Sequence, residues 1–305
     1  MNRRSALRHT SALALAPAAL AAAPHSPPPP SAPAPFTLPF APHVGMFAAH
    51  AGPDILDQIR FAADRGFTAW EDNGMPGREP QVQEAIGELL AKRGMQMGVF
   101  VANTINWTEP TLTLGPGEHR DQLLADIRAA VDVARRCNAT WMTVVPGFVD
   151  LKTEPGYQMA NVVESLKQAA AILEPHNLVM VLEPLNYRDH PGMFLTKAAQ
   201  AYAVCKAVDS PACKILFDVY HQQIHEGNLI PNIDAAWDEI AYFQLGDNPG
   251  RKEPTTGEIN YGNLLRHIHE KGYTGVYGME HGNSVAGKAG EMKVIEAYRS
   301  VDVVA

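Results

Sequence analysis

Short apolar runs alternate with longer amphipathic segments along most of this 305-residue chain. The short runs have the length and composition of β-strands, and the segments between them carry apolar residues at the three- and four-residue spacing of helices. Strands that are apolar throughout are buried on both faces, as in a parallel sheet covered by helices. The eight predicted strands are 43–47, 67–71, 95–101, 140–145, 178–183, 214–219, 240–245 and 275–280.

The number of strand–helix repeats selects among the α/β folds. A barrel of eight such units needs about 250 residues, which this chain supplies after its N-terminal segment. No G-x-G-x-x-G follows the first strand and no P-loop motif occurs, so a dinucleotide-binding or nucleotide-binding sheet has no support. We therefore predict a single (β/α)8 TIM barrel over residues 42–305, with Asp54 as a helix cap.

The first 41 residues differ from the rest in composition. Arg3 and Arg4 precede an apolar run over 11–23, and a proline-rich stretch follows over 25–35. This order predicts a twin-arginine signal peptide over 1–21, a disordered spacer over 22–41 and a periplasmic location. The alternative is an uncleaved membrane tether. The apolar run is short for a transmembrane helix, so no stable membrane insertion is expected.

Charge and cysteine usage exclude some classes of partner. The formal net charge is −8, and removal of the predicted signal peptide, which holds three arginines and no acids, leaves −11. An acidic surface argues against a nucleic-acid partner, whose phosphates are bound by lysine and arginine. Cys137, Cys205 and Cys213 have no C-x-x-C spacing and are expected to be buried free thiols.

Four predicted strands end at a side chain suited to metal binding or proton transfer: Glu183, Asp218, Gln244 and Glu280. The carboxyl ends of barrel strands face one mouth, so these oxygens are expected to converge and to hold a hard divalent cation. Glu183 and Glu280 should face each other across that mouth. Two such carboxylates can pass protons between adjacent carbons of a hydroxy-ketone, as an isomerase or epimerase requires.

The stretches around these residues resemble the hydroxypyruvate isomerase family of the xylose-isomerase-like superfamily. The matching motifs are LEPLN (182–186), FDVYHQQ (217–223), QLGDNPGRKEPTTGEINY (244–261) and GMEHGN (278–283). The resemblance implies a metal held by Glu183, Asp218, Gln244 and Glu280, with Glu183 and Glu280 also serving as the acid/base pair. It further implies that His221 and Arg251 bind the oxygens of the substrate.

The surrounding residues are consistent with those roles. His221 should lie on the exit loop of strand six, within reach of a substrate hydroxyl, although it could instead cap a helix. Arg251 offers a planar fork for a carboxylate or for vicinal oxygens, unless it pairs with Glu253 or Glu258 in its own loop. Glu71 and Asn103 follow strands two and three and are predicted to line the pocket. Trp107 should either cover a sugar face or anchor its loop.

Gln244 bears on the choice of metal. Related epimerases of the superfamily have histidine at this position, whereas an amide keeps the ligand set all-oxygen and favours Mg²⁺ or Mn²⁺. The DNA-repair endonucleases of the superfamily need several histidine ligands, which the strand ends of this chain lack.

The combined prediction is an exported isomerase that interconverts hydroxypyruvate and tartronate semialdehyde. Because export is unusual for that reaction, an epimerase, isomerase or lyase acting on a keto-sugar or keto-glycoside is the alternative. A non-catalytic periplasmic sugar-binding barrel and a metal-dependent hydrolase are the remaining candidates, and a homo-oligomer is left open.

Overall fold

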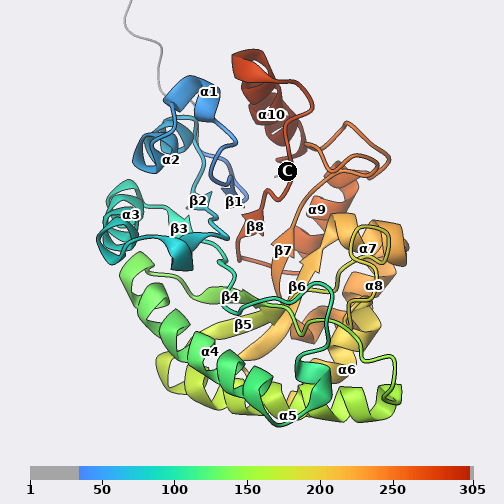
Figure 1. Cartoon of the computed structure of the whole chain (residues 1–305). Helices are drawn as coiled ribbons and strands as arrows, with labels where there is room; N and C mark the ends of the chain where they lie inside the picture. Colours follow the sequence, from blue (N-terminus) through green and yellow to red (C-terminus); the bar gives the residue numbers. More distant parts are fainter. Residues whose placement is uncertain (1–33, 303–305) are drawn as a thin grey trace, which may run out of the picture. The chain divides into compact units, whose positions relative to one another are not determined.

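Parallel strands alternate with helices around a ring in the computed structural model, which describes residues 34–302 (Figure 1). This part of the chain contains eight strands, each followed by a helical segment. The strands are β1 Phe40–Ala41, β2 Ala69–Trp70, β3 Gln96–Met97, β4 Trp141–Val144, β5 Val179–Leu182, β6 Cys213–Asp218, β7 Ile240–Gln244 and β8 Tyr277–Gly278.

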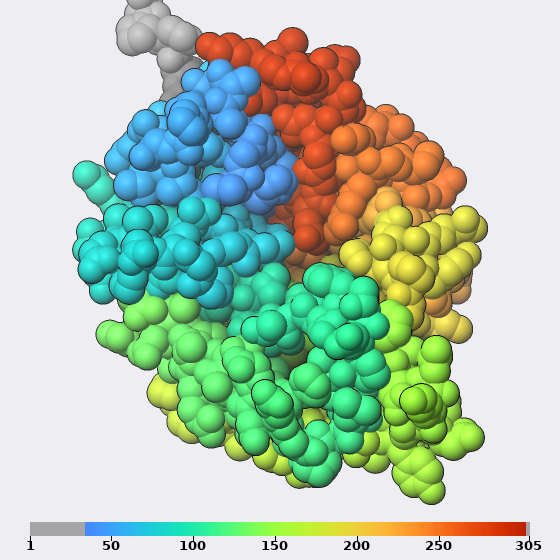
Figure 2. Space-filling model, viewed as in Figure 1, coloured from blue at the N-terminus to red at the C-terminus, as the bar shows by residue number. Residues whose placement is uncertain are grey.

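The ring is continuous on one side and loosely joined on the other. Six strands form one sheet in the order β1-β8-β7-β6-β5-β4, and β2 pairs with β3 separately. Isolated parallel bridges complete the circle, with His43 paired to Glu71 and Val101 paired to Thr143. The first and last strands pair directly, so the blue N-terminal and red C-terminal segments lie side by side (Figures 1 and 2).

Amphipathic helices cover the outside of the ring, as the sequence periodicity predicts. Large apolar side chains, among them Phe40, Trp70 and Phe217, fill the layer between strands and helices. A second cluster, made mostly of alanine and valine together with Tyr242, packs separately from that layer. The helices are α1 Ala48–Ala51, α2 Ile55–Asp64, α3 Pro80–Arg93, α4 Glu118–Cys137, α5 Pro155–Leu173, α6 Ala198–Val208, α7 Val219–His225, α8 Leu229–Ala236, α9 Tyr261–Glu270 and α10 Gly287–Val301.

The first strand lies earlier than predicted. Of the predicted strand 43–47, only His43 takes part in a bridge, and residues 44–47 form a turn before α1, in which Gly45 has φ 92°. The strand is instead Phe40–Ala41, flanked by Pro39 and Pro42, which gave this segment the appearance of a spacer. Phe36 and Phe40 are buried, so residues 34–41 belong to the packed structure. The predicted signal peptide and the spacer as far as residue 33 lie outside the described residues.

Two local predictions elsewhere are confirmed, the helix cap at Asp54 and the buried free cysteines. Asp54 caps α2, because its Oδ1 accepts hydrogen bonds from the backbone N–H groups of Leu56 (2.8 Å) and Asp57 (3.1 Å). The three cysteines are buried and free. None of the helices within residues 34–302 has the length and apolar character that crossing a bilayer requires.

Candidate active site

The four predicted chemical residues come from consecutive strands of the continuous sheet. Glu183 directly follows β5, Asp218 ends β6, Gln244 ends β7, and Glu280 lies two residues beyond β8. Asp218 is paired in register with Gln244, and Gln244 with Gly278. The sheet therefore places all four at one edge of the ring, as predicted.

A cavity of about 160 Å³ opens beside these residues. Its polar wall includes Glu183, His221, Arg251 and Glu280. Its apolar wall is formed by Ile105, Trp107, Val145 and Leu185. Asp218 and Gln244 lie beside this polar wall without lining the cavity, and both are buried. The arrangement offers proton-transfer groups on one side of a small substrate and a water-excluding surface on the other.

Arg251 links two of the predicted metal ligands. Its Nη2 lies 2.8 Å from Asp218 Oδ2 and 2.8 Å from Glu280 Oε2, and its Nε donates to the Glu280 carbonyl oxygen at 3.0 Å. It makes no ion pair with Glu253 or Glu258, the alternative that the sequence left open. The guanidinium is thus the cation that these carboxylates face in the structure.

The donor set also fits a divalent cation. Ligand atoms of Glu183, Asp218 and His221 all lie within 4.8 Å of one another. The Oε1 atom of Gln244 is buried and accepts no hydrogen bond. A buried carbonyl oxygen without a hydrogen-bond donor is available as a ligand for a hard divalent cation.

Glu71 lies next to the site rather than on the cavity wall predicted for it. Its Oε1 accepts from Gln244 Nε2 at 2.8 Å, and its Oε2 accepts from the Tyr242 hydroxyl at 2.8 Å. Because Glu71 takes the amide nitrogen of Gln244, the amide oxygen is left free to face a cation. Glu71 therefore fixes the orientation of the Gln244 amide.

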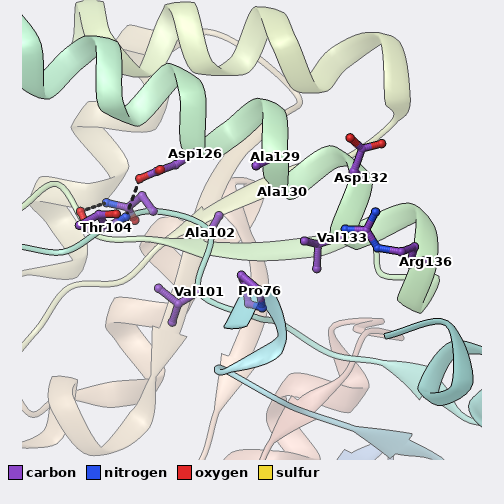
Figure 3. Close-up of a pocket in the computed structure, with 11 residues that line it drawn as sticks. Pro76, Val101, Ala102, Thr104, Asp126, Ala129, Ala130, Asp132, Val133 and Arg136 are labelled. Atoms are coloured by element: carbon purple, nitrogen blue, oxygen red, sulfur yellow. Dashed lines mark hydrogen bonds between the residues drawn. The ribbon is translucent and has the colours of Figure 1, made fainter. Parts of the chain in front are cut away.

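Asn103 is also displaced from its predicted place. Its amide donates to the carbonyl oxygen of Val145 (3.0 Å) and accepts from the N–H of the same residue (3.1 Å), so its hydrogen-bonding capacity is used by the backbone. It lines a different cavity of about 410 Å³, between α4 and the chain after β3 (Figure 3). There Asp126 accepts from the Thr104 N–H, and the neighbouring wall is largely alanine and valine.

Burial shifts the proton affinities of the site. Desolvation, reinforced by Glu280 and Asp218, raises the pKa of Glu183 well above its ordinary value. Burial also raises the pKa of Glu71 to about 8. Burial, aided by Arg251, lowers the pKa of His221 to about 3. Burial therefore favours the protonated carboxyl of Glu183 and the neutral imidazole of His221.

A family model for the xylose isomerase-like TIM barrel matches residues 59–300. The chain belongs to this family. Hydroxypyruvate isomerase of Escherichia coli strain K12 is 34% identical over 255 residues, which cover 81% of this chain and 94% of that protein. The 2-oxo-tetronate isomerase of Cupriavidus necator is 30% identical over 241 residues, covering 77% of this chain and 89% of that protein.

Solved structures agree on the fold. A 3-keto-D-glucoside 4-epimerase from E. coli superposes with a TM-score of 0.72 at 17% identity, covering 86% of this chain and 99% of that chain. A structure described as AP endonuclease, family 2, from Brucella melitensis gives 0.73 at 23% identity, covering 82% and 95%. At these identities the likeness concerns the xylose isomerase-like fold alone.

Three further residues of this chain contact the site, although they were not predicted as site residues from the sequence. Asn73 donates from Nδ2 to Glu280 Oε1 at 3.2 Å, two residues beyond Glu71. His190 lies between the rings of Trp107 and His221, with centroid distances of 5.2 and 5.4 Å. Asn186 contacts His221 directly. Only Asn186 had a signal in the sequence, because it ends the LEPLN motif.

Proposed function

We propose that the protein is an isomerase of small hydroxy-keto acids that interconverts hydroxypyruvate and tartronate semialdehyde. The observation that carries this proposal is the presence of Glu183 and Glu280 on one cavity of about 160 Å³ with Arg251 and His221. A cavity of this size suits a three- or four-carbon substrate. The relatives named hydroxypyruvate isomerase and 2-oxo-tetronate isomerase support the same substrate class.

The reaction moves hydrogen between adjacent carbons without changing the composition of the substrate. One glutamate removes a proton from the hydroxymethyl carbon of hydroxypyruvate while the ketone oxygen takes up a proton, which gives an enediol. A proton returned to the former ketone carbon, with loss of the proton on the other hydroxyl, gives the aldehyde. Glu183 and Glu280, which both line the cavity, are the two carriers. His221 and Arg251 hold the substrate oxygens in the meantime.

A divalent cation, Mg²⁺ or Mn²⁺, is part of this proposal. Glu183, Asp218, Gln244 and Glu280 would hold it, a role supported by their oxygen donors and by the unpartnered Oε1 of Gln244. When bound, it would stabilise negative charge on the substrate oxygens. The protein groups then have to position the substrate and exclude water.

Proton exchange with solvent tests the reaction class. Incubation of hydroxypyruvate with the protein and Mn²⁺ or Mg²⁺ in D₂O should introduce deuterium beside the carbonyl and form tartronate semialdehyde, as followed by NMR. Glu183→Gln and Glu280→Gln should slow both processes by about 100-fold or more, since each removes an acid/base group. Glu258→Gln, a change at an exposed glutamate, is the matched control and should keep full activity.

A keto-sugar or keto-glycoside substrate is the competing candidate, favoured by the predicted export signal and tested in the same assay. Exchange on a keto-sugar, but not on hydroxypyruvate, would replace the proposed reaction. Exchange on no substrate would argue for a binding function instead.

We also propose a periplasmic location. Fractionation and N-terminal sequencing should find the protein outside the cytoplasm with Ala22 at its start. Substitution of both Arg3 and Arg4 by lysine should retain it in the cytoplasm. Unchanged export of that variant would rule out the twin-arginine route.

A further inference from the structure

Asn186, on the loop that follows β5, is fully buried against the ring of His221. Its side-chain Nδ2 lies 2.7 Å from His221 Nδ1, and its backbone N–H points to the same ring nitrogen at 3.3 Å. Two groups of one residue therefore meet a single nitrogen of the imidazole.

The orientation of the Asn186 amide follows from its other contacts. Its Oδ1 accepts hydrogen bonds from the backbone N–H groups of Arg188 and Asp189, both at 3.0 Å. Its Nδ2 also donates to the Asp189 carboxylate at 3.0 Å. A backbone N–H can only donate and a carboxylate accepts, so the oxygen and nitrogen of the amide cannot be exchanged. The group that faces His221 is the NH₂.

The protonation pattern of the ring follows in turn. Both groups of Asn186 that reach Nδ1 are donors, so Nδ1 must offer its lone pair. In a neutral imidazole the proton then sits on Nε2. That nitrogen is directed to the site, 3.6 Å from both Glu183 Oε1 and Asp218 Oδ2.

We propose that Asn186 is a positioning residue that holds His221 as the Nε2–H tautomer. In this form the ring can donate a hydrogen bond to an oxygen of the substrate, and Nε2 has no lone pair with which to bind a cation. His221 is therefore a substrate-side donor, although its position beside Glu183 and Asp218 also fits a metal ligand.

This role, which rests on the proposed function, has a specific chemical consequence. The enediol step places negative charge on a substrate oxygen, and a fixed N–H donor stabilises that charge more than it stabilises the ground-state carbonyl. The opposite tautomer would present a lone pair to the same oxygen and would repel it. We therefore expect loss of the tautomer to lower kcat more than it raises KM.

The tautomer can be read directly in the resting protein. With ¹⁵N-labelled histidine, two-dimensional NMR distinguishes a protonated from an unprotonated ring nitrogen, and loss of the signal in His221→Gln assigns it. The wild type should show a protonated Nε2 and a bare Nδ1. A protonated Nδ1 in the wild type would overturn the proposal. This readout needs no substrate, so it stands even if hydroxypyruvate is not turned over.

Asn186→Asp is the decisive variant, because it changes the donor to an acceptor with almost no change in shape. It should move the ring proton to Nδ1 and lower kcat by about 100-fold, the effect of losing one donor to a developing oxyanion. Asn186→Ala keeps the backbone N–H and should give a mixture of tautomers with a smaller loss. This second variant serves if the first does not fold.

Asn161→Asp is the matched control. Asn161 donates from Nδ2 to the Thr113 carbonyl, and neither residue lines the cavity at Glu183 and Glu280, so its variant should lose stability but keep both the tautomer and kcat. If Asn186→Asp lost turnover with the Nε2–H tautomer intact, Asn186 would be merely structural. If the tautomer inverted with kcat unchanged, His221 would not be the proposed donor. Either result would overturn the proposal.

Discussion

Arg251 shows at the scale of one residue how the site balances its charge. Its backbone has φ 50°, in the left-handed region that non-glycine residues rarely adopt, next to Gly250 at φ 100°. This turn brings the guanidinium onto Asp218 and Glu280, where the carboxylates raise its pKa although burial acts in the opposite sense. The same two carboxylates are among the four predicted cation ligands, so a bound metal would compete with the guanidinium for their charge.

Arg251→Gln is expected to strengthen cation binding. Removing the guanidinium leaves Asp218 and Glu280 without their counter-charge, so Mn²⁺ should bind at least about tenfold more tightly, which corresponds to about 1.4 kcal/mol. Isothermal titration calorimetry with Mn²⁺ measures this without any turnover, and Arg251→Lys, which keeps the charge, is the control. Equal or weaker binding by Arg251→Gln would show that the two cations do not compete.

Glu71 should make stability depend on pH. Burial raises its pKa from 4.5 to about 8, so the folded protein keeps a proton that the unfolded chain releases. The stabilisation is fully present below about pH 4.5 and is lost as the pH rises through about 8. Over this range the unfolding free energy of the wild type should fall relative to that of Glu71→Gln. Urea denaturation in EDTA at several pH values measures the difference, and parallel curves would contradict the shift.

At the scale of elements, β5 to β8 could be predicted with their site residues, whereas β1 could not. Each strand from β5 to β8 is an apolar run that ends at or just before a polar side chain. The hydrogen-bonded pairing of these strands holds those side chains at one edge of the ring. The two-residue strand β1 lies between prolines and carries no such pattern. The contacts of Glu71 and Asn103 could not be predicted. Their place after a strand indicates that they lie near the mouth of the barrel, but it does not determine the direction in which each side chain points.

The loop between β3 and α4 should affect substrate binding more than folding. Trp107 in this loop has 46% of its surface exposed, yet its ring packs on His190 at the cavity. Trp107→Ala is therefore expected to raise KM several-fold and to change the free energy of unfolding by less than about 1 kcal/mol. Initial rates and urea denaturation measure the two effects. Tyr157→Ala, at an exposed position outside the cavity lining, is the control, and an equal effect on KM there would refute a local role.

At the scale of the molecule, the described structure depends on residues ahead of the predicted barrel boundary. Phe36, Leu38 and Phe40 are at most 3% exposed, and β1 pairs with β8. A chain that starts at residue 34 should therefore fold like one that starts at residue 22. One that starts at residue 42 should lose about 6 kcal/mol, from three buried side chains at about 2 kcal/mol each. This loss is comparable to the whole stability of many domains.

Thermal denaturation followed by circular dichroism compares these three chains. A cooperative transition at the wild-type temperature in the chain that starts at residue 42 would show that β1 is dispensable. The N-terminal composition predicts export but does not indicate β1, because Pro39 and Pro42, which flank this strand, resemble the prolines of the spacer.

The strands of the ring are joined by a continuous hydrogen-bonded sheet on one side and by isolated bridges on the other. Changes to substrate entry and changes to the proton-transfer groups therefore fall on different sides of the ring. Glu183, Asp218, Gln244 and Glu280 all belong to the hydrogen-bonded side, from β5 to β8, whereas Ile105 and Trp107 follow β3, on the side held by isolated bridges. Substitutions and insertions after β3 can therefore reshape what enters the cavity while the proton-transfer groups keep their spacing. A library of variants confined to residues 102–118 should therefore change the substrate specificity while the proton-transfer reaction is kept.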